Sequence, residues 1–191
     1  MVHLDKERMK MIRIVIAEDQ EMLLGVIGSL LNMESDMEVV GQARNGDETL
    51  TLVQQLQPDV CIMDIDMSGM SKLEVVDACM TTGCKVIILS TFAKTGYFEG
   101  ALKAGVRGYL LKDTPSEELI ASIHSIMKGE YIYSSELLDK DSRDNEQGIE
   151  MFERVTGSQI INEGSYQKSN KIVSVRSFFS TIMDKMKLPA G

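Results

Sequence analysis

Five short apolar runs recur at nearly even intervals along this chain of 191 residues, and they restrict its fold more than any other feature. They occupy residues 11–17, 37–43, 59–64, 85–90 and 106–112. Several are continuously apolar, as in KVIILS, which is typical of strands buried on both faces of a parallel sheet. Segments with helical periodicity lie between them. The alternation predicts a doubly wound α/β fold of five parallel strands with helices on both faces. With the strand order 2-1-3-4-5, the first and third strands are neighbours and the fourth lies beside the third.

Polar and charged side chains stand at the ends of four of the predicted strands. They are Glu18 and Asp19 after the first, Asp64 at the end of the third, Ser90 and Thr91 at the end of the fourth, and Lys112 and Asp113 after the fifth. Each alone is ordinary, because such residues commonly form turns and cap helices. Ligands of doubly wound sheets bind beyond the carboxyl ends of the strands, so the whole set predicts one shared pocket.

Three carboxylates in one pocket restrict its chemistry. At about 4 Å and an effective dielectric constant of 20, each close pair repels by about 4 kcal/mol. Either one carboxyl group stays protonated or a cation binds, and Mg²⁺ suits a set of oxygen ligands. A lysine and a hydroxyl nearby would neutralise and hydrogen-bond phosphoryl oxygens. The residue types therefore predict transfer of a phosphoryl group onto a carboxylate.

Four motifs, AEDQ, PDVCIMDIDMSG, VIILSTF and GYLLKD, resemble in order and spacing the receiver domain of bacterial two-component response regulators, over residues 11–133. GYLLKD is similar to the NarL/FixJ subfamily. The resemblance implies a CheY/flavodoxin-like fold and a role for each matching residue. It makes Asp64 the phosphoacceptor, Glu18, Asp19, Asp64 and the backbone carbonyl of Asp66 the Mg²⁺ ligands, Ser90 the switch hydroxyl, Lys112 the phosphate-binding lysine and Tyr109 the aromatic residue whose rotamer reports activation. Two departures from the family pattern are Ser68, where proline is usual, and Glu18, where aspartate is common.

The C-terminal part of the chain differs in character. Residues 1–144 contain 14 Lys and Arg against 24 Asp and Glu, a net charge of −10, whereas residues 145–191 contain 6 against 5, a net of +1. We interpret 134–147 as a linker and 148–191 as a degenerate or truncated helix-turn-helix segment. Its candidate DNA contacts are Lys168, Lys171 and Arg176. Alternatively, the amphipathic helix predicted over 173–188 packs or dimerises without contacting DNA.

The resemblance implies a phosphorylation-switched regulator of transcription that receives its phosphoryl group from a sensor histidine kinase, dimerises and binds promoter DNA. AEDQEMLLG, QPDVCIMDI and PSEEL are similar to a member that regulates membrane-lipid genes in bacilli, which makes such genes the candidate targets. Self-catalysed phosphoryl transfer to Asp64 and slow autodephosphorylation are its expected chemistry, so it is not an enzyme in the usual sense. An alternative is a receiver that acts through protein contacts only. A phosphatase with an Asp-x-Asp loop at 64–66 is disfavoured, because such a pair follows the first strand of its fold and this one follows the third.

Three further features bear on location. Cys61, Cys79 and Cys84 lack metal-ligand spacing, which favours free thiols in a reducing compartment. The charged start MVHLDKERMK is unlike a signal peptide. No apolar run approaches the roughly 20 residues that span a bilayer. We therefore expect a cytoplasmic protein without direct membrane insertion.

Overall fold

The computed structural model describes residues 11–68, 72–91 and 100–134. Their elements follow in the order β1 (Ile12–Ala17), α1 (Glu21–Leu31), β2 (Met37–Ala43), α2 (Gly46–Leu56), β3 (Val60–Asp64), α3 (Lys72–Thr82), β4 (Lys85–Ser90), β5 (Gly108–Leu111), α5 (Ser116–Met127) and β6 (Ile132–Tyr133). The segment predicted at 148–191, with its amphipathic helix at 173–188, lies outside the described residues.

All strands of the sheet are parallel, and their order is β2-β1-β3-β4-β5-β6. The predicted doubly wound α/β fold and the order of its first five strands are confirmed. The sheet has a sixth strand that the sequence pattern does not predict, because two residues are too few to show any periodicity. In β6, Ile132 pairs with Gly108 and Tyr133 pairs with Tyr109.

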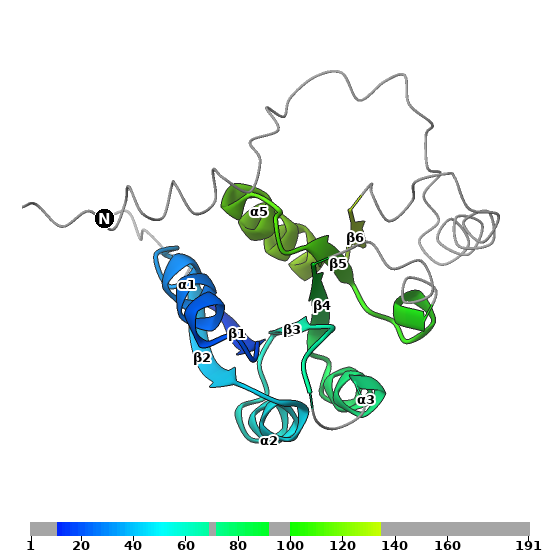
Figure 1. Cartoon of the computed structure of the whole chain (residues 1–191). Helices are drawn as coiled ribbons and strands as arrows, with labels where there is room; N and C mark the ends of the chain where they lie inside the picture. The colour runs from blue at the N-terminus through cyan, green and yellow to red at the C-terminus, as the bar shows by residue number, and fades with distance from the viewer. Residues whose placement is uncertain (1–10, 69–71, 92–99, 135–191) are drawn as a thin grey trace, which may run out of the picture.

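Two apolar layers hold the helices on the sheet, with α1 and α5 on one face and α2 and α3 on the other (Figure 1). Successive side chains of a strand point to opposite faces. In β1, Ile14 and Ile16 therefore join the layer beneath α1 and α5, while Val15 and Ala17 join the layer beneath α2 and α3. Burial of both faces explains why the strands read as continuous apolar runs.

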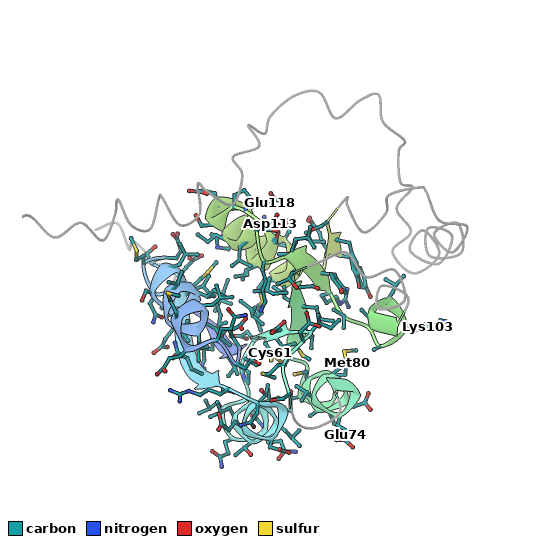
Figure 2. The ribbon with its side chains drawn as sticks, in the orientation of Figure 1. Cys61, Glu74, Met80, Lys103, Asp113 and Glu118 are labelled. Carbon is teal, nitrogen blue, oxygen red and sulfur yellow. The ribbon has the colours of Figure 1, made fainter. Side chains whose placement is uncertain are left out.

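The three cysteines are buried and free, as the sequence indicates. Cys61 lies in the middle of the sheet, whereas the exposed side chains of Glu74 and Lys103 point outward from the fold (Figure 2). Within the described residues, none of the helices has the length and apolar character needed to cross a membrane.

Candidate functional site

The ends of β1, β3 and β5 place three charged side chains in direct contact. Glu18 follows β1, Asp64 is the last residue of β3 and Lys112 follows β5. The Nζ atom of Lys112 lies 2.8 Å from Oε2 of Glu18 and 3.0 Å from Oδ2 of Asp64. The two carboxylate side chains are only 2% and 3% exposed, and the lysine side chain is 10% exposed. Lys112 is therefore a largely buried cation shared by two buried carboxylates.

Burial and ion pairing act in opposite directions on these groups. Removal from water raises the pKa of Glu18 above its usual value, although hydrogen bonds from Lys112 and from the backbone N–H of Gln20 oppose this. Burial by itself lowers the pKa of Lys112, but its hydrogen bonds to Glu18 and Asp64 outweigh burial and leave that pKa raised. The lysine therefore stays charged at neutral pH.

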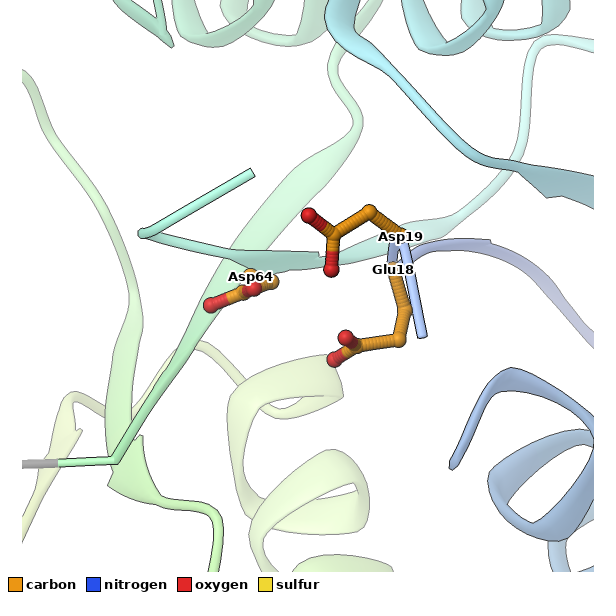
Figure 3. A group of neighbouring side chains, drawn as sticks. All are labelled: Glu18, Asp19 and Asp64. Carbon is orange, nitrogen blue, oxygen red and sulfur yellow. The ribbon is translucent and has the colours of Figure 1, made fainter. Parts of the chain in front are cut away.

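A third carboxylate completes an acidic cluster. Carboxylate oxygens of Glu18, Asp19 and Asp64 all lie within 4.8 Å of one another, and the three side chains converge on one space (Figure 3). Asp19 is exposed, so the cluster is open to solvent on its side. Three carboxylates are a donor set that fits a hard divalent cation, and an open side leaves room for water or a phosphoryl oxygen among its ligands.

The loop after β3 fixes the orientation of Asp64. The backbone N–H of Asp66 donates to Oδ1 of Asp64 at 3.0 Å, so each oxygen of this carboxylate has a partner of its own. The hydroxyl of Thr91 donates to Oδ2 of Asp66 at 3.4 Å. Further along the loop, the backbone N–H of Gly46, at the start of α2, donates to the carbonyl of Ser68 at 3.3 Å. This contact holds the loop at the position where the family usually has proline.

The two predicted switch residues lie on β4 and β5. Ser90 is buried at the end of β4, and its carbonyl accepts a 2.7 Å hydrogen bond from the backbone N–H of Lys112. Tyr109 is fully buried on β5, where it pairs with Ile88 of β4. Ser90 therefore lies next to Lys112, and Tyr109, on β5, lies three residues before Lys112 in the chain. Their roles stay predictions.

Sequence reasoning did not assign a role to Thr91 or Tyr133. Thr91 stands at the predicted pocket and contacts the loop through Asp66. The ring of Tyr133 stacks on that of Tyr109. No motif marks Tyr133, because its position follows from the sixth strand. The candidate DNA contacts Lys168, Lys171 and Arg176 lie outside the described residues.

Comparison with known families agrees with this arrangement. Residues 14–124 match the model of the response regulator receiver domain. The chain belongs to the response regulator family. Receiver domains bind Mg²⁺ at an acidic pocket, and Glu18, Asp19 and Asp64 form an acidic cluster in this structure.

Individual relatives indicate the subfamily within the response regulators. The chain is 50% identical over 182 residues to the transcriptional regulatory protein DesR of Bacillus subtilis, a match that covers 93% of this chain and 92% of DesR. It is 33% identical over 126 residues to the nitrate/nitrite response regulator protein NarL of Escherichia coli, covering 65% of this chain and 58% of NarL. This response regulator is therefore DesR-like and of the NarL family.

A solved structure extends the likeness to three dimensions. A DNA-binding response regulator of the LuxR family from Staphylococcus aureus superposes with a TM-score of 0.58 at 36% identity, over 61% of this chain and 99% of that structure. The match to DesR is longer than the receiver family's stretch of 14–124, so the similarity to DesR continues into the C-terminal part of the sequence.

Proposed function

We propose that this two-component response regulator, which controls transcription, accepts a phosphoryl group on Asp64 from a sensor histidine kinase. The observation that carries the proposal is the contact of Lys112 with both Glu18 and Asp64 at 2.8 and 3.0 Å in a buried site. A buried carboxylate with a shared cation and an adjacent acidic pair is suited to a reaction in which negative charge arrives with the substrate.

Asp64 acts as the nucleophile. One of its carboxylate oxygens attacks phosphorus, the P–N bond to the kinase imidazole breaks, and the electron pair of that bond stays on the imidazole nitrogen. The hydrogen bond from the Asp66 N–H holds one oxygen of Asp64, which restricts the rotation of the carboxylate before the reaction. Catalysis of the transfer consists of positioning and charge neutralisation. Autodephosphorylation is proposed to be slow.

Glu18, Asp19, Asp64 and the backbone carbonyl of Asp66 would hold Mg²⁺, which supplies positive charge to the phosphoryl oxygens when it is bound. Lys112 supplies the second positive charge. Since Lys112 already contacts Asp64, a phosphoryl group on that carboxylate would lie within reach of the ammonium group.

Ser90 and Tyr109 form the switch. The phosphoryl group adds about −1.5 to −2 charges at Asp64. The hydroxyl of Ser90 moves toward the new oxygens, and the ring of Tyr109 follows into the space that the hydroxyl leaves. The two states exist before phosphorylation, which changes their populations.

Output is dimerisation and binding to promoter DNA, in the cytoplasm. The similarity to DesR over 92% of that protein supports a DNA-binding role for residues 148–191, after a receiver at 11–133 and a linker at 134–147. Lys168, Lys171 and Arg176 are the proposed DNA contacts, and genes of membrane lipids are the proposed targets.

Intact-protein mass spectrometry tests the phosphoacceptor. Wild type treated with a small phosphodonor and Mg²⁺ should gain an adduct of about 80 Da, the mass of one phosphoryl group. Asp64→Ala should gain none. Asp66→Ala is the matched control, because it removes a neighbouring carboxylate but keeps the backbone carbonyl, and it should still gain the adduct. An adduct on Asp64→Ala would refute the assignment.

Gel-shift titration tests the output. Binding to promoter DNA should strengthen after treatment with the phosphodonor, and Arg176→Ala should weaken it. Phosphorylation without any DNA binding at low salt would favour the alternative, a receiver that acts through protein contacts only.

A further inference from the structure

The sixth strand lies at the edge of the sheet, beside the strand that carries the switch tyrosine (Figure 1). It is also the last element before the predicted linker. Backbone hydrogen bonds join the two segments at their ends: the N–H of Ile132 donates to the carbonyl of Arg107, just before β5, and the N–H of Ser134, just after β6, donates to the carbonyl of Tyr109, each at 2.9 Å. The switch residue and the end of the receiver are thus joined directly through the main chain.

Side chains join the same two segments. The rings of Tyr109 and Tyr133 are stacked, with centroids 6.4 Å apart and planes inclined by 30°, which is within the range of a favourable aromatic pair. The hydroxyl of Tyr133 donates to the carbonyl of Val106 at 2.6 Å. Burial is the main cause that raises the pKa of Tyr133, so its hydroxyl keeps the proton that this bond requires.

The segment before β6 is held independently of the stack. The guanidinium of Arg107 lies 4.3 Å from the centre of the Tyr131 ring, and its Nη1 atom donates to the carbonyl of Gly129 at 3.0 Å. These contacts fix the approach of the chain to β6 without involving the ring of Tyr109. Tyr131 therefore serves as an internal comparison for Tyr133.

We propose that Tyr133 is a positioning residue for the switch: its ring stabilises Tyr109 in the unphosphorylated state, and rotation of Tyr109 loosens β6 from β5. The stack and the rotated position of the Tyr109 ring exclude each other sterically. Side chains occupy discrete rotamers, and a change of one χ1 well moves a tyrosine ring by several ångströms. The stack at 6.4 Å does not survive such a displacement. Docking of β6 and rotation of Tyr109 thus compete.

The coupling between phosphorylation of Asp64 and the docking of β6 on β5 is reciprocal. If phosphorylation at Asp64 loosens β6, then weakening the attachment of β6 must favour the phosphorylated state by the same factor. A typical aromatic pair changes an equilibrium constant by about fivefold, and we expect the coupling factor to be of this size. This inference rests on the proposed function, because it takes the phosphorylation of Asp64 and the rotation of Tyr109 as given.

Hydrogen exchange measured by mass spectrometry tests the proposal in the full chain, with the adduct of about 80 Da recorded on the same samples. After phosphodonor and Mg²⁺, a wild-type peptide spanning 129–134 should exchange about fivefold faster. In Tyr133→Leu the same peptide should already exchange fast before treatment and should change little after it. Tyr133→Phe keeps the ring and should behave like wild type, which a merely structural role of the hydroxyl would not predict. Tyr131→Leu should retain the response to phosphorylation.

A second measurement uses Mg²⁺ with beryllofluoride as a phosphoryl analogue. The apparent affinity of the protein for beryllofluoride should rise about fivefold in Tyr133→Leu and stay unchanged in Tyr131→Leu. A wild type that gains the adduct with no change of exchange at 129–134 overturns the proposal and leaves the proposed function intact. A wild type that gains no adduct overturns both. Because the wild-type arm is decisive, the test holds even where Tyr133→Leu fails to fold.

Discussion

Lys112→Met removes the cation that Glu18 and Asp64 share, and the structure predicts its cost. Methionine has nearly the length of lysine without the charge. The two contacts of 2.8 and 3.0 Å each correspond to about 6 kcal/mol of attraction at an effective dielectric constant of 20, which the desolvation of Lys112 largely offsets. Removing one partner of a buried ion pair costs about 3–5 kcal/mol. We expect the variant to lose about 4 kcal/mol of unfolding free energy at pH 7 without Mg²⁺.

The loss should depend on pH at both ends of the range. The pKa of Glu18 is already raised by burial, and without Lys112 it rises further. A folded state that binds more protons than the unfolded state gains stability as pH falls, by up to about 1.4 kcal/mol per pH unit for one group. The difference between variant and wild type should therefore shrink from pH 7 to pH 5.

The stabilising effect of Lys112 has the opposite dependence on pH. The pKa of Lys112 in the folded protein is raised from 10.5, so its stabilising effect is fully present below that pH and is lost as pH rises through the folded value. The difference between variant and wild type should therefore also shrink above about pH 10.5. The difference in unfolding free energy is largest in the neutral to mildly alkaline range, between these two limits.

Urea denaturation followed by circular dichroism measures these differences. Lys128→Met is the matched control, because Lys128 is exposed at the end of α5, and it should change the unfolding free energy by no more than about 0.5 kcal/mol. The double variant Glu18→Gln with Lys112→Met should recover part of the loss, since it removes one uncompensated carboxylate. A loss below about 1 kcal/mol, or one that is equal at pH 5 and pH 7, would refute the buried ion-pair reasoning.

Two further predictions concern a packing contact and a polar side-chain contact. Gly108→Ala should lower the unfolding free energy by about 1–3 kcal/mol in thermal denaturation, because the new Cβ would lie 2.8 Å from Cδ1 of Ile126. Gly25→Ala in α1 is the control: its new Cβ would have no neighbour within 4 Å, so the variant should be neutral or more stable by about 0.5–1 kcal/mol. Equal effects of the two substitutions would contradict a role of close packing at Gly108. His124→Ala should lower the unfolding free energy by up to about 1 kcal/mol by removing the 2.8 Å contact with Asp36. This effect should vanish in an Asp36→Ala background, where the side-chain acceptor is already absent.

The sequence alone predicts the sheet and the ends of its strands. Continuous apolar runs such as KVIILS indicate strands covered on both faces, and the structure places them in the predicted order with Ser90 at the end of β4 and Asp64 at the end of β3. This succeeds because parallel strands share one carboxyl edge, so position along the chain translates directly into position in space. Residue type at that edge then indicates the chemistry.

Other features are decided only by the tertiary structure. A lone lysine after a strand is typical of a solvated surface. Lys112 is instead largely buried between Glu18 and Asp64, because three strands distant in sequence end at the same place. Tyr133 belongs to no motif, and its stack on Tyr109 exists because a two-residue strand adds to the edge of the sheet. Local pattern determines which elements form, whereas contacts between elements far apart in the chain determine which side chains meet.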